Sequence, residues 1–359
     1  MKRLLALLLV FGLIAAACGS DDDDDNGDTG SATTAPSDDM TDDMTDDMMT
    51  PDVLNVAYFE QWPTPNQAGQ EDGSFEEAVG VPINWIPLGT GGQMAEAMLS
   101  GDVDIAYSMG LTPFANNVNG GADLKMVGVA VSYSEADNCV AQGSLGVTKE
   151  NASETLVGAK IMSPTGNITH FKLLSTLEFF GISLDDIEFI ANDDGAAIAA
   201  AFESGEIDVG CAFGGPVVNM LDNGGNVILT GAEAESDLGI FTYDIVAIPS
   251  GFGETYPDVV TSFLAATEDF NNKWAANAEE WNPIIAQAAG MEDVGNFLAG
   301  DLWFAFPSIA DQLGPDWLGG AAADNMAAQV QTFVDLGLIE SIIDDFGATV
   351  DPSFLEAVG

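Results

Sequence analysis

An internal repeat is the feature that most limits what this chain can fold into. Residues 100–110 read SGDVDIAYSMG and residues 204–214 read SGEIDVGCAFG, at a constant offset of 104 residues. Each copy follows a helix-like stretch, so each predicts a helix, a tight glycine turn and a short strand that ends in a glycine loop. Two similar α/β units in one chain predict two lobes that face each other across a cleft, which is a natural place to close over a small ligand.

Strand-like and helix-like segments alternate through both halves of the chain. In the first half we expect strands over 53–59, 81–86, 103–107 and 124–131, with helices over 75–78, 93–99 and 111–119. In the second half we expect strands over 159–162, 187–190, 207–213 and 227–229, with helices over 167–180 and 196–203. This alternation predicts an α/β fold in which each lobe is a mostly parallel sheet flanked by helices.

Two chain crossings are expected between the lobes. One lies near residues 139–147, and a long strand over 241–248 returns the chain to the first lobe, which together make a two-strand hinge. Beyond Tyr256 the chain is predicted to be helical and to pack on the outside of the first lobe, with residues 257–274 as the clearest amphipathic segment. The expected boundaries are 52–138 plus 240–359 for lobe 1 and 139–239 for lobe 2.

The N-terminus has the pattern of an export signal. Lys2 and Arg3 precede an apolar run over residues 4–17, which ends in three alanines before Cys18. This pattern predicts a signal peptide over 1–17, and the alanines before Cys18 resemble a bacterial lipobox, so that Cys18 would carry lipid. A membrane-spanning helix is the disfavoured alternative, because about 14 apolar residues fall short of the roughly 20 needed. We therefore expect a protein of the cell envelope, lipid-anchored on the extracytoplasmic face; without the lipid it would be freely secreted.

Residues 18–51 are expected to form a lipidated cysteine followed by a disordered acidic tether. Residues 19–51 hold twelve Asp and no Lys or Arg, including a repeated Asp-Asp-Met-Thr unit. Too few apolar groups are present to offset the entropy of ordering this segment. Copper or calcium binding by its Met and Asp residues is the less favoured alternative, because nothing fixes the geometry of such a site.

The charge balance excludes some classes of partner. After removal of Lys2 and Arg3, the chain keeps 5 Lys and no Arg against 58 acidic residues, a formal charge of −53 (5 − 58). Nucleic acids and anionic membrane surfaces both require basic patches, so neither is expected as a partner. Self-repulsion on this scale favours a salty habitat.

Two further cysteines are expected to form a disulfide. With Cys18 assigned to lipid, Cys139 and Cys211 remain as an even pair in an oxidising compartment. Two buried free thiols, which behave as small apolar side chains, are the alternative.

No catalytic or metal-binding motif stands out in the chain. His170 is its only histidine, and no Cys-His or Ser-His-Asp spacing accompanies it. His170 either packs inside the fold or lines the cleft. Acidic residues are abundant, but no spaced His/Cys cluster or calcium loop is present, so we expect no enzyme activity, no metal and no cofactor.

Glycine turns that open helices are the candidates for binding an anion without a basic residue. Free backbone N–H groups and the helix dipole attract negative charge at such ends. One turn lies in each expected lobe, and a third loop follows the first copy of the repeat. The candidate residues are Gly91, Gly92 and Gln93 in the first turn, Thr165, Gly166 and Asn167 in the second, and Ser108, Gly110 and Thr112 in the loop. Ordinary helix capping is the alternative for any single turn.

Four strings of residues resemble the taurine-binding proteins of ABC importers. They are residues 106–114, 125–133, 138–140 and 208–215, which read AYSMGLTPF, KMVGVAVSY, NCV and DVGCAFGG. The likeness runs from about Val53 to Trp274. It implies a two-lobed periplasmic-binding-protein (Venus-flytrap) fold, and a receptor that delivers an aminosulfonate to a membrane permease. One departure is GNITHF at 166–171, where the family usually reads Gly-Thr and then His-Tyr.

Taurine is a zwitterion, so its ammonium needs acceptors while its sulfonate needs donors. The candidate acceptors are Glu60, Asp208 and Asp244. Asp208 has a counterpart in the repeat, Asp104, which favours a shared structural role, whereas Asp244 has none and is the stronger candidate. Aromatic walls are expected from Trp62, Phe213 and Tyr243, because a ring face attracts an ammonium; core packing is the alternative.

The sequence thus predicts a monomeric binding protein for taurine or a close aminosulfonate. Its partners would be that ligand, an ABC permease and, through Cys18, the membrane. The alternatives are the same kind of receptor for an alkanesulfonate or a betaine, and an enzyme related to pyrimidine synthesis on the same fold.

Overall fold

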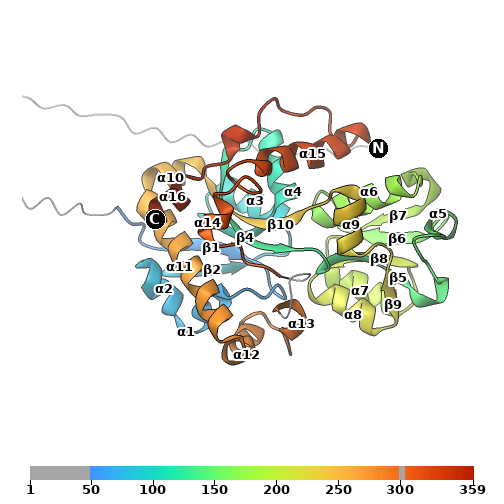
Figure 1. Ribbon diagram of the computed structural model, residues 1–359, viewed down its shortest axis with the longest axis horizontal. Helices are drawn as coiled ribbons and strands as arrows, with labels where there is room; N and C mark the ends of the chain where they lie inside the picture. Colours follow the sequence, from blue (N-terminus) through green and yellow to red (C-terminus); the bar gives the residue numbers. More distant parts are fainter. Residues whose placement is uncertain (1–48, 299–303) are drawn as a thin grey trace, which may run out of the picture. The chain divides into compact units, whose positions relative to one another are not determined.

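The structure is a computed structural model that describes residues 49–298 and 304–359. The expected signal peptide, Cys18 and nearly all of the acidic tether lie outside the described residues. The described chain contains two five-stranded sheets flanked by helices (Figure 1). The two-lobed fold expected from the repeat is confirmed.

The first sheet has the strand order β2-β1-β3-β10-β4. Strands β1, β2 and β3 run parallel, and β10 runs antiparallel to both of its neighbours. The strands are β1 (Leu54–Tyr58), β2 (Ile83–Pro87), β3 (Ile105–Gly110), β4 (Leu124–Tyr133) and β10 (Thr242–Pro249). The helices between them are α1 (Asn66–Asp72), α2 (Ser74–Val79), α3 (Gly91–Ser100) and α4 (Leu111–Asn119).

The second sheet repeats this plan with the order β7-β6-β8-β5-β9. Strands β6, β7 and β8 run parallel, and β5 runs antiparallel to β8 and β9. The strands are β5 (Asp137–Gln142), β6 (Lys160–Ser163), β7 (Glu188–Ala191), β8 (Val209–Phe213) and β9 (Gly225–Val227). The helices are α5 (Ala152–Thr155), α6 (Ile168–Phe179), α7 (Gly195–Glu203), α8 (Gly215–Asp222) and α9 (Gly231–Leu238).

The chain passes between the two sheets twice. It leaves β4 and enters β5 through residues 134–136, and it leaves α9 and enters β10 through residues 239–241. The first crossing precedes the segment 139–147 in which it was expected. Residues 137–142 form a strand because they pair with both β8 and β9, so the second sheet already begins at Asp137.

The repeat has the same structural role in both sheets. The carboxylate of Asp104 accepts a hydrogen bond of 2.8 Å from the backbone N–H of Asn55 in β1. In the second sheet the carboxylate of Asp208 accepts a bond of 2.8 Å from the N–H of Lys160 in β6. Asp104 thus ties the turn before β3 to the start of β1, and Asp208 ties the turn before β8 to the start of β6. The repeated aspartate therefore stabilises the pairing of neighbouring strands in both sheets.

The C-terminal part of the chain is mostly helical. Its helices are α10 (Ser250–Thr255), α11 (Pro257–Ala276), α12 (Ala278–Ala288), α13 (Gly295–Leu298), α14 (Ile309–Gln312), α15 (Ala321–Asp335) and α16 (Ser353–Val358). Between α15 and α16 the described chain has only the short 3-10 helix Gly347–Thr349. The expectation of helix to the end of the chain is therefore met only in part.

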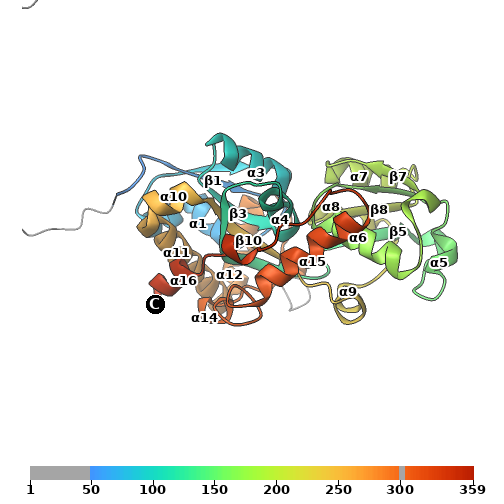
Figure 2. The same ribbon diagram turned by 90° about the horizontal axis from the view of Figure 1, so that it is seen from above.

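Helix α15 does not stay on the outside of the first lobe. It contacts α4 of that lobe and α6 of the other, and both views show it beside α6 (Figures 1 and 2). Phe333 of α15 packs in one apolar cluster with Phe171, Leu174 and Ala234 of the second lobe. Burial of these apolar side chains holds α15 against both lobes.

Cys139 and Cys211 form a disulfide, as the sequence predicts. The two residues are directly opposite each other in the antiparallel β5–β8 pair, with their α-carbons 4.0 Å apart. This geometry lies close to that of a non-hydrogen-bonded antiparallel pair, in which side chains approach most closely. The bond therefore joins the strand that enters the second sheet to the centre of that sheet.

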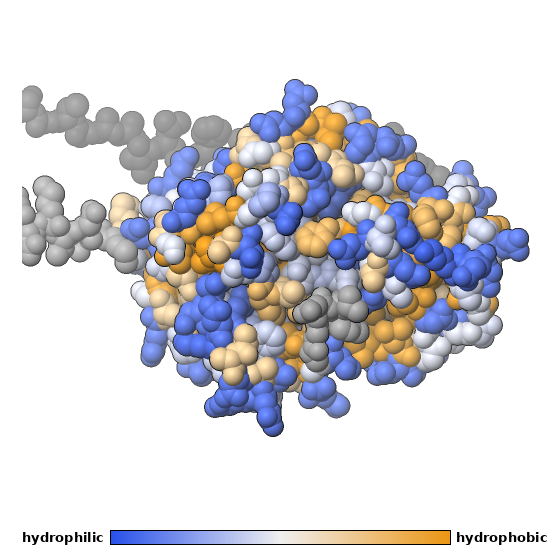
Figure 3. All heavy atoms as spheres, in the orientation of Figure 1, coloured by the Kyte–Doolittle hydropathy of each residue, from blue (hydrophilic) through white to orange (hydrophobic). Residues whose placement is uncertain are grey.

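Hydrophilic residues project around the face of the molecule drawn in Figure 3, and apolar residues lie between them. Within the described residues no helix is both long enough and apolar enough to span a membrane.

Candidate functional site

A cavity of about 30 Å³ lies between the two lobes. It is lined by Phe59, Trp62, Gly91, Gly110, Pro113, Tyr133, Asp137, Asn167, Ile168, Phe213 and Asp244. Most of these residues lie at or just after the carboxyl ends of parallel strands, where open α/β sheets bind their ligands. Two of them lie at the amino ends of antiparallel strands: Asp137 begins β5 and Asp244 is the third residue of β10.

Asp244 is a buried carboxyl group held by two hydroxyl groups. Tyr133 donates a hydrogen bond of 2.8 Å to Oδ1 of Asp244, and Ser108 donates one of 3.0 Å to Oδ2. Burial raises the pKa of Asp244 to about 8, although both hydrogen bonds act to lower it. The side chain is only 2% exposed, so a cation in the cavity would be its natural counter-charge.

Ser108 is itself positioned by Trp62. The indole N–H of Trp62 donates a bond of 3.0 Å to Oγ of Ser108, which in turn donates to Asp244. Ser108 has a φ of 67°, a conformation that is uncommon for residues other than glycine. Such outliers cluster at functional sites, where the surrounding structure holds them. Here the strained residue aims its hydroxyl at the buried carboxyl group.

Three helices begin at the wall of the cavity. Gly91 is the first residue of α3, Gly110 is the N-cap of α4, and Asn167 and Ile168 begin α6. A Cβ atom added to Gly91 would lie 2.5 Å from Cγ of Pro113, so only glycine allows α3 to start this close to α4. The unpaired N–H groups and dipoles of these three ends favour an anion in the cavity.

Asp137 is a second buried carboxyl group at the cavity. Its Oδ2 accepts a bond of 2.9 Å from the hydroxyl of Thr169, and the ammonium of Lys172 donates to its backbone carbonyl. Burial raises the pKa of Asp137 to about 6, opposed by the charge of Lys172 and the bond from Thr169. The pKa of the buried Lys172 is lowered by the same loss of solvent.

Aromatic rings close one side of the cavity. Trp62 packs edge-on against Tyr133 and Phe213, with ring centroids 4.8 Å and 5.8 Å apart. Phe213 comes from the second lobe, and it also contacts Phe59 of the first lobe at 5.6 Å. These rings therefore bring the two lobes into contact beside the cavity.

Four expected site residues lie in a neighbouring, larger space. Gly92, Gln93, Thr165 and Gly166 line a cavity of about 480 Å³ that shares Pro113 and Asn167 with the smaller one. The two lobes contact each other there, because the side chain of Asn116 donates a bond of 3.1 Å to the carbonyl of Gly166. These residues therefore lie beside the smaller cavity.

Ser108 lines neither space but donates its hydroxyl to Asp244, and four other expected residues also line neither space, each with a partner in the fold. The hydroxyl of Thr112 donates to the side chain of Gln329 at 2.6 Å, and Asp208 holds strand β6 as described above. His170 stacks on Phe189, accepts a bond from the N–H of Gly166, and has a pKa lowered to about 4 by burial.

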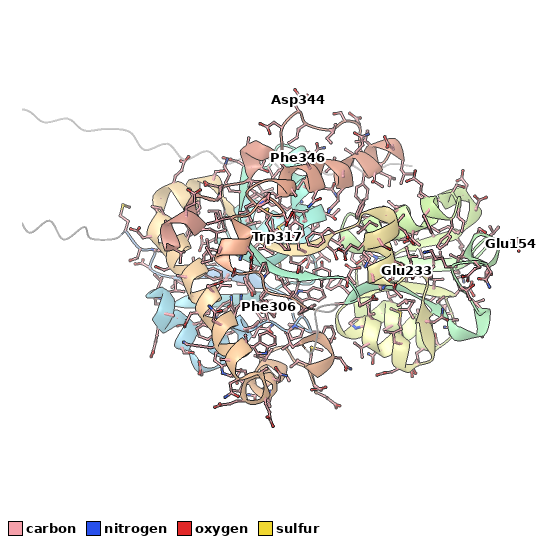
Figure 4. The ribbon with its side chains drawn as sticks, viewed as in Figure 1. Glu154, Glu233, Phe306, Trp317, Asp344 and Phe346 are labelled. Atoms are coloured by element: carbon pink, nitrogen blue, oxygen red, sulfur yellow. A yellow bond between two sulfur atoms is a disulfide. The ribbon has the colours of Figure 1, made fainter. Side chains whose placement is uncertain are left out.

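Tyr243 is the fourth of these residues. It precedes Asp244 in β10, so its side chain points to the opposite face of the sheet. There it packs against Phe241 and against Trp317, which is labelled in Figure 4. Glu60, the remaining acceptor candidate, lines another cavity of about 290 Å³, which shares Phe59 and Phe213 with the small one.

Sequence reasoning did not single out five residues that line the small cavity: Phe59, Pro113, Tyr133, Asp137 and Ile168. A usable signal existed for two of them. Phe59 and Tyr133 directly follow or end strands of the first sheet, where ligands of α/β proteins bind. Asp137 gave no such signal, because the strand that it begins was expected to be a crossing segment.

A metal ion would need several side chains that could bind it together. Within residues 49–298 and 304–359, no group of three or more His, Cys, Asp or Glu side chains is placed to hold an ion.

Known proteins share both sequence and fold with this chain. It is 29% identical over 228 residues to the taurine-binding periplasmic protein of Escherichia coli, covering 64% of this chain and 68% of that protein. The crystal structure of the periplasmic aliphatic sulphonate binding protein of Escherichia coli has a TM-score of 0.67 at 20% identity, over 82% of this chain and 91% of that one. The alkanesulfonate-binding protein of Xanthomonas axonopodis pv. citri, bound to MOPS, has a TM-score of 0.68 at 18% identity, over 84% and 99%.

These solved structures confirm the fold that the resemblance implied. The profile of the family described as "NMT1/THI5 like" matches residues 64–280, which is more than half of the chain. The chain belongs to the NMT1/THI5-like family.

Proposed function

We propose that this protein binds taurine or a close aminosulfonate in the small cavity and delivers it to an ABC permease. One observation carries the proposal: a single cavity between the lobes is lined by a buried carboxyl group, Asp244, and by three helix N-termini. A ligand that carries both an ammonium and a sulfonate satisfies both features. The relative that binds taurine supports the same ligand class.

Each end of the ligand has its own partners in this proposal. The helix ends at Gly91, Gly110 and Asn167 hold the sulfonate, so no arginine is needed. Asp244 accepts a hydrogen bond from the ammonium, and the ring of Trp62 adds cation–π attraction of about 0.5–2 kcal/mol. Closure of the two lobes around the ligand is the functional event.

The setting of the protein is also a proposal. Export through the signal at 1–17 and lipid on Cys18 would anchor it at the extracytoplasmic face of the membrane as a monomer. The periplasmic location given in the names of two relatives supports an extracytoplasmic protein. The acidic segment before residue 52 would then separate the binding lobes from the membrane.

The alternative functions have less support from the site. An alkanesulfonate lacks the ammonium that Asp244 and the aromatic rings suit, and a betaine has no N–H group to donate to a carboxylate. The curated relative is named as a taurine-binding periplasmic protein and not as an enzyme, which favours a binding function over an enzyme on this fold. Fold alone does not separate binding proteins from enzymes.

A binding experiment tests the proposal directly. Calorimetry in concentrated salt is expected to show that taurine binds and that propane-1-sulfonate, in which a methyl replaces the ammonium, binds at least tenfold more weakly. Glycine betaine should not bind measurably, because the carboxyl group requires N–H donors and a quaternary ammonium has none. Tighter binding of propane-1-sulfonate than of taurine would contradict the proposal.

Taurine binding should release a proton at neutral pH. With its pKa at about 8, Asp244 is mostly protonated in the ligand-free protein at pH 7 and must ionise to pair with an ammonium. The charged or titratable groups that act on it are Tyr107, Tyr133 and Asp137, of which Asp137 raises its pKa further. We expect close to one proton to be released at pH 7, and affinity to rise about tenfold per pH unit up to about pH 8.

Calorimetry in buffers with different ionisation enthalpies measures this proton release. The sign is decisive, because proton uptake, or an affinity that falls as the pH rises from 6 to 8, would show that Asp244 does not ionise on binding.

A further inference from the structure

The proposed function leaves one buried group in the cavity unused. Asp137 is only 2% exposed, and its Oδ1 has no hydrogen-bond partner in the part of the chain that the structure describes. Its other oxygen is occupied by Thr169. A buried acceptor without a partner is costly, so each such group in a native structure calls for an explanation.

The position of Asp137 suggests what its partner is. It lines the same small cavity as Asp244, and the negative charge of Asp137 raises the pKa of Asp244, which shows that the two groups interact. Two carboxyl groups that line one cavity repel each other when both are ionised. A cation with several N–H donors, placed between them, removes that repulsion and satisfies both.

We propose that Asp137 is the second acceptor for the ligand's ammonium, so that the cavity selects a primary amine over N-methylated amines. This inference rests on the proposed function of the same cavity. A primary ammonium has three N–H donors, which is enough for Asp244 and for Oδ1 of Asp137 together. An N,N-dimethyl ammonium has one donor, so it leaves one of the two carboxylates without a bond.

Lys172 supplies a positive charge that acts on Asp137. Its ammonium is buried and donates to the backbone carbonyls of Asp137 and Ser134. Its positive charge favours the ionised form of Asp137. The negative charge of Asp137 is therefore partly balanced by Lys172. Within the described residues, Asp244 has no such cation beside it and depends on the ligand's ammonium for a counter-charge.

The test combines one substitution with a series of ligands. Asp137→Asn keeps an oxygen for Thr169 but turns an N–H group toward the position of Oδ1, where it would face the ammonium. We expect taurine to bind this variant at least tenfold more weakly than it binds the wild-type protein, since one charge-assisted hydrogen bond is lost. N,N-dimethyltaurine should lose less than threefold, because its one donor serves Asp244.

Thr169→Val is the matched control. It removes the hydrogen bond to Oδ2 of Asp137 without changing the cavity-facing oxygen. A purely structural role for Asp137 would make both variants weaken both ligands by the same factor, and that result would overturn the inference. If the wild-type protein binds neither taurine nor its methylated forms, the proposed function itself fails.

A measurement without a variant keeps the inference testable even if Asp137→Asn does not fold. In a crystal structure of the wild-type protein with taurine, the ligand nitrogen should lie about 3 Å from Oδ1 of Asp137 and within hydrogen-bond distance of Asp244. A nitrogen that contacts Asp244 alone would overturn the role of Asp137 and leave the proposed function standing.

Discussion

Removal of the disulfide is expected to lower the free energy of unfolding by about 4 kcal/mol. The bond joins Cys139 and Cys211 across 72 residues of sequence, so it restricts a long loop in the unfolded chain. Both residues are buried in the core of the second lobe. The double substitution Cys139→Ala and Cys211→Ala should therefore destabilise the second lobe, as measured by denaturant unfolding in concentrated salt.

Reduction of the wild-type protein provides the matched control, because it breaks the bond without removing a side chain. The reduced protein and the double variant should lose similar amounts of stability, and the difference between them measures the packing of the two sulfur atoms. Mass spectrometry of unreduced peptides checks the bond itself. If both thiols can be alkylated in the exported protein, the disulfide is absent and no loss is expected.

The fold could be predicted from the sequence because its signals are local and repeated. The 104-residue repeat places Asp104 and Asp208 before equivalent strands, and the structure gives both the same bond to a neighbouring strand. Helix α4 was predicted with its observed bounds, Leu111–Asn119, because the glycine before it and the glycine after it mark both ends.

The candidate site was harder to predict because its residues come together only in the folded chain. The sequence favours Asp244 because it has no counterpart in the repeat, and it suggests Tyr243 because an aromatic ring can attract an ammonium. Alternation along β10 places these neighbours on opposite faces, so Asp244 lines the cavity while Tyr243 packs against Trp317. Strand β10 is buried on both faces, so burial does not alternate along it. Its mostly apolar sequence therefore does not indicate which of its residues face the cavity.

Asp137 shows a second limit of sequence reasoning. It lies at the amino end of the antiparallel strand β5, just as Asp244 lies near the amino end of the antiparallel strand β10. In each sheet this is the strand that enters from the other lobe. The equivalence appears only when both strand directions are known, and the repeat does not include either strand.

The glycine turns predict where helices begin near the cavity, but they do not identify which residues line it. Gly91 and Asn167 line the small cavity, but the adjacent Gly92 and Gly166 line only the larger space beside it. A glycine turn predicts that a helix begins and that its N–H groups are available. It does not predict which of three successive residues faces a ligand, because that depends on the angle at which the helix leaves the sheet.

Asp244→Asn is expected to weaken taurine binding by about 1.5–3 kcal/mol, which is roughly 10- to 150-fold. The substitution keeps the shape of the side chain and an oxygen that can accept the bond from Tyr133, and its amide can donate to Ser108 in place of the bond that Ser108 now donates. It removes only the negative charge that pairs with the ammonium. The ligand-free variant should be as stable as the wild-type protein or more so, since the carboxyl group is buried without a counter-charge.

Propane-1-sulfonate separates this role from a structural one. It has no ammonium, so its affinity should stay the same or rise in Asp244→Asn, because an unpaired buried carboxyl group has been removed. The proton released on taurine binding at pH 7 should also disappear in this variant, because the group that releases it is gone. Calorimetry with both ligands and both proteins gives the two differences. Equal losses for taurine and propane-1-sulfonate would mean that Asp244 supports the fold, and the acceptor for the ammonium would then have to be Asp137 alone.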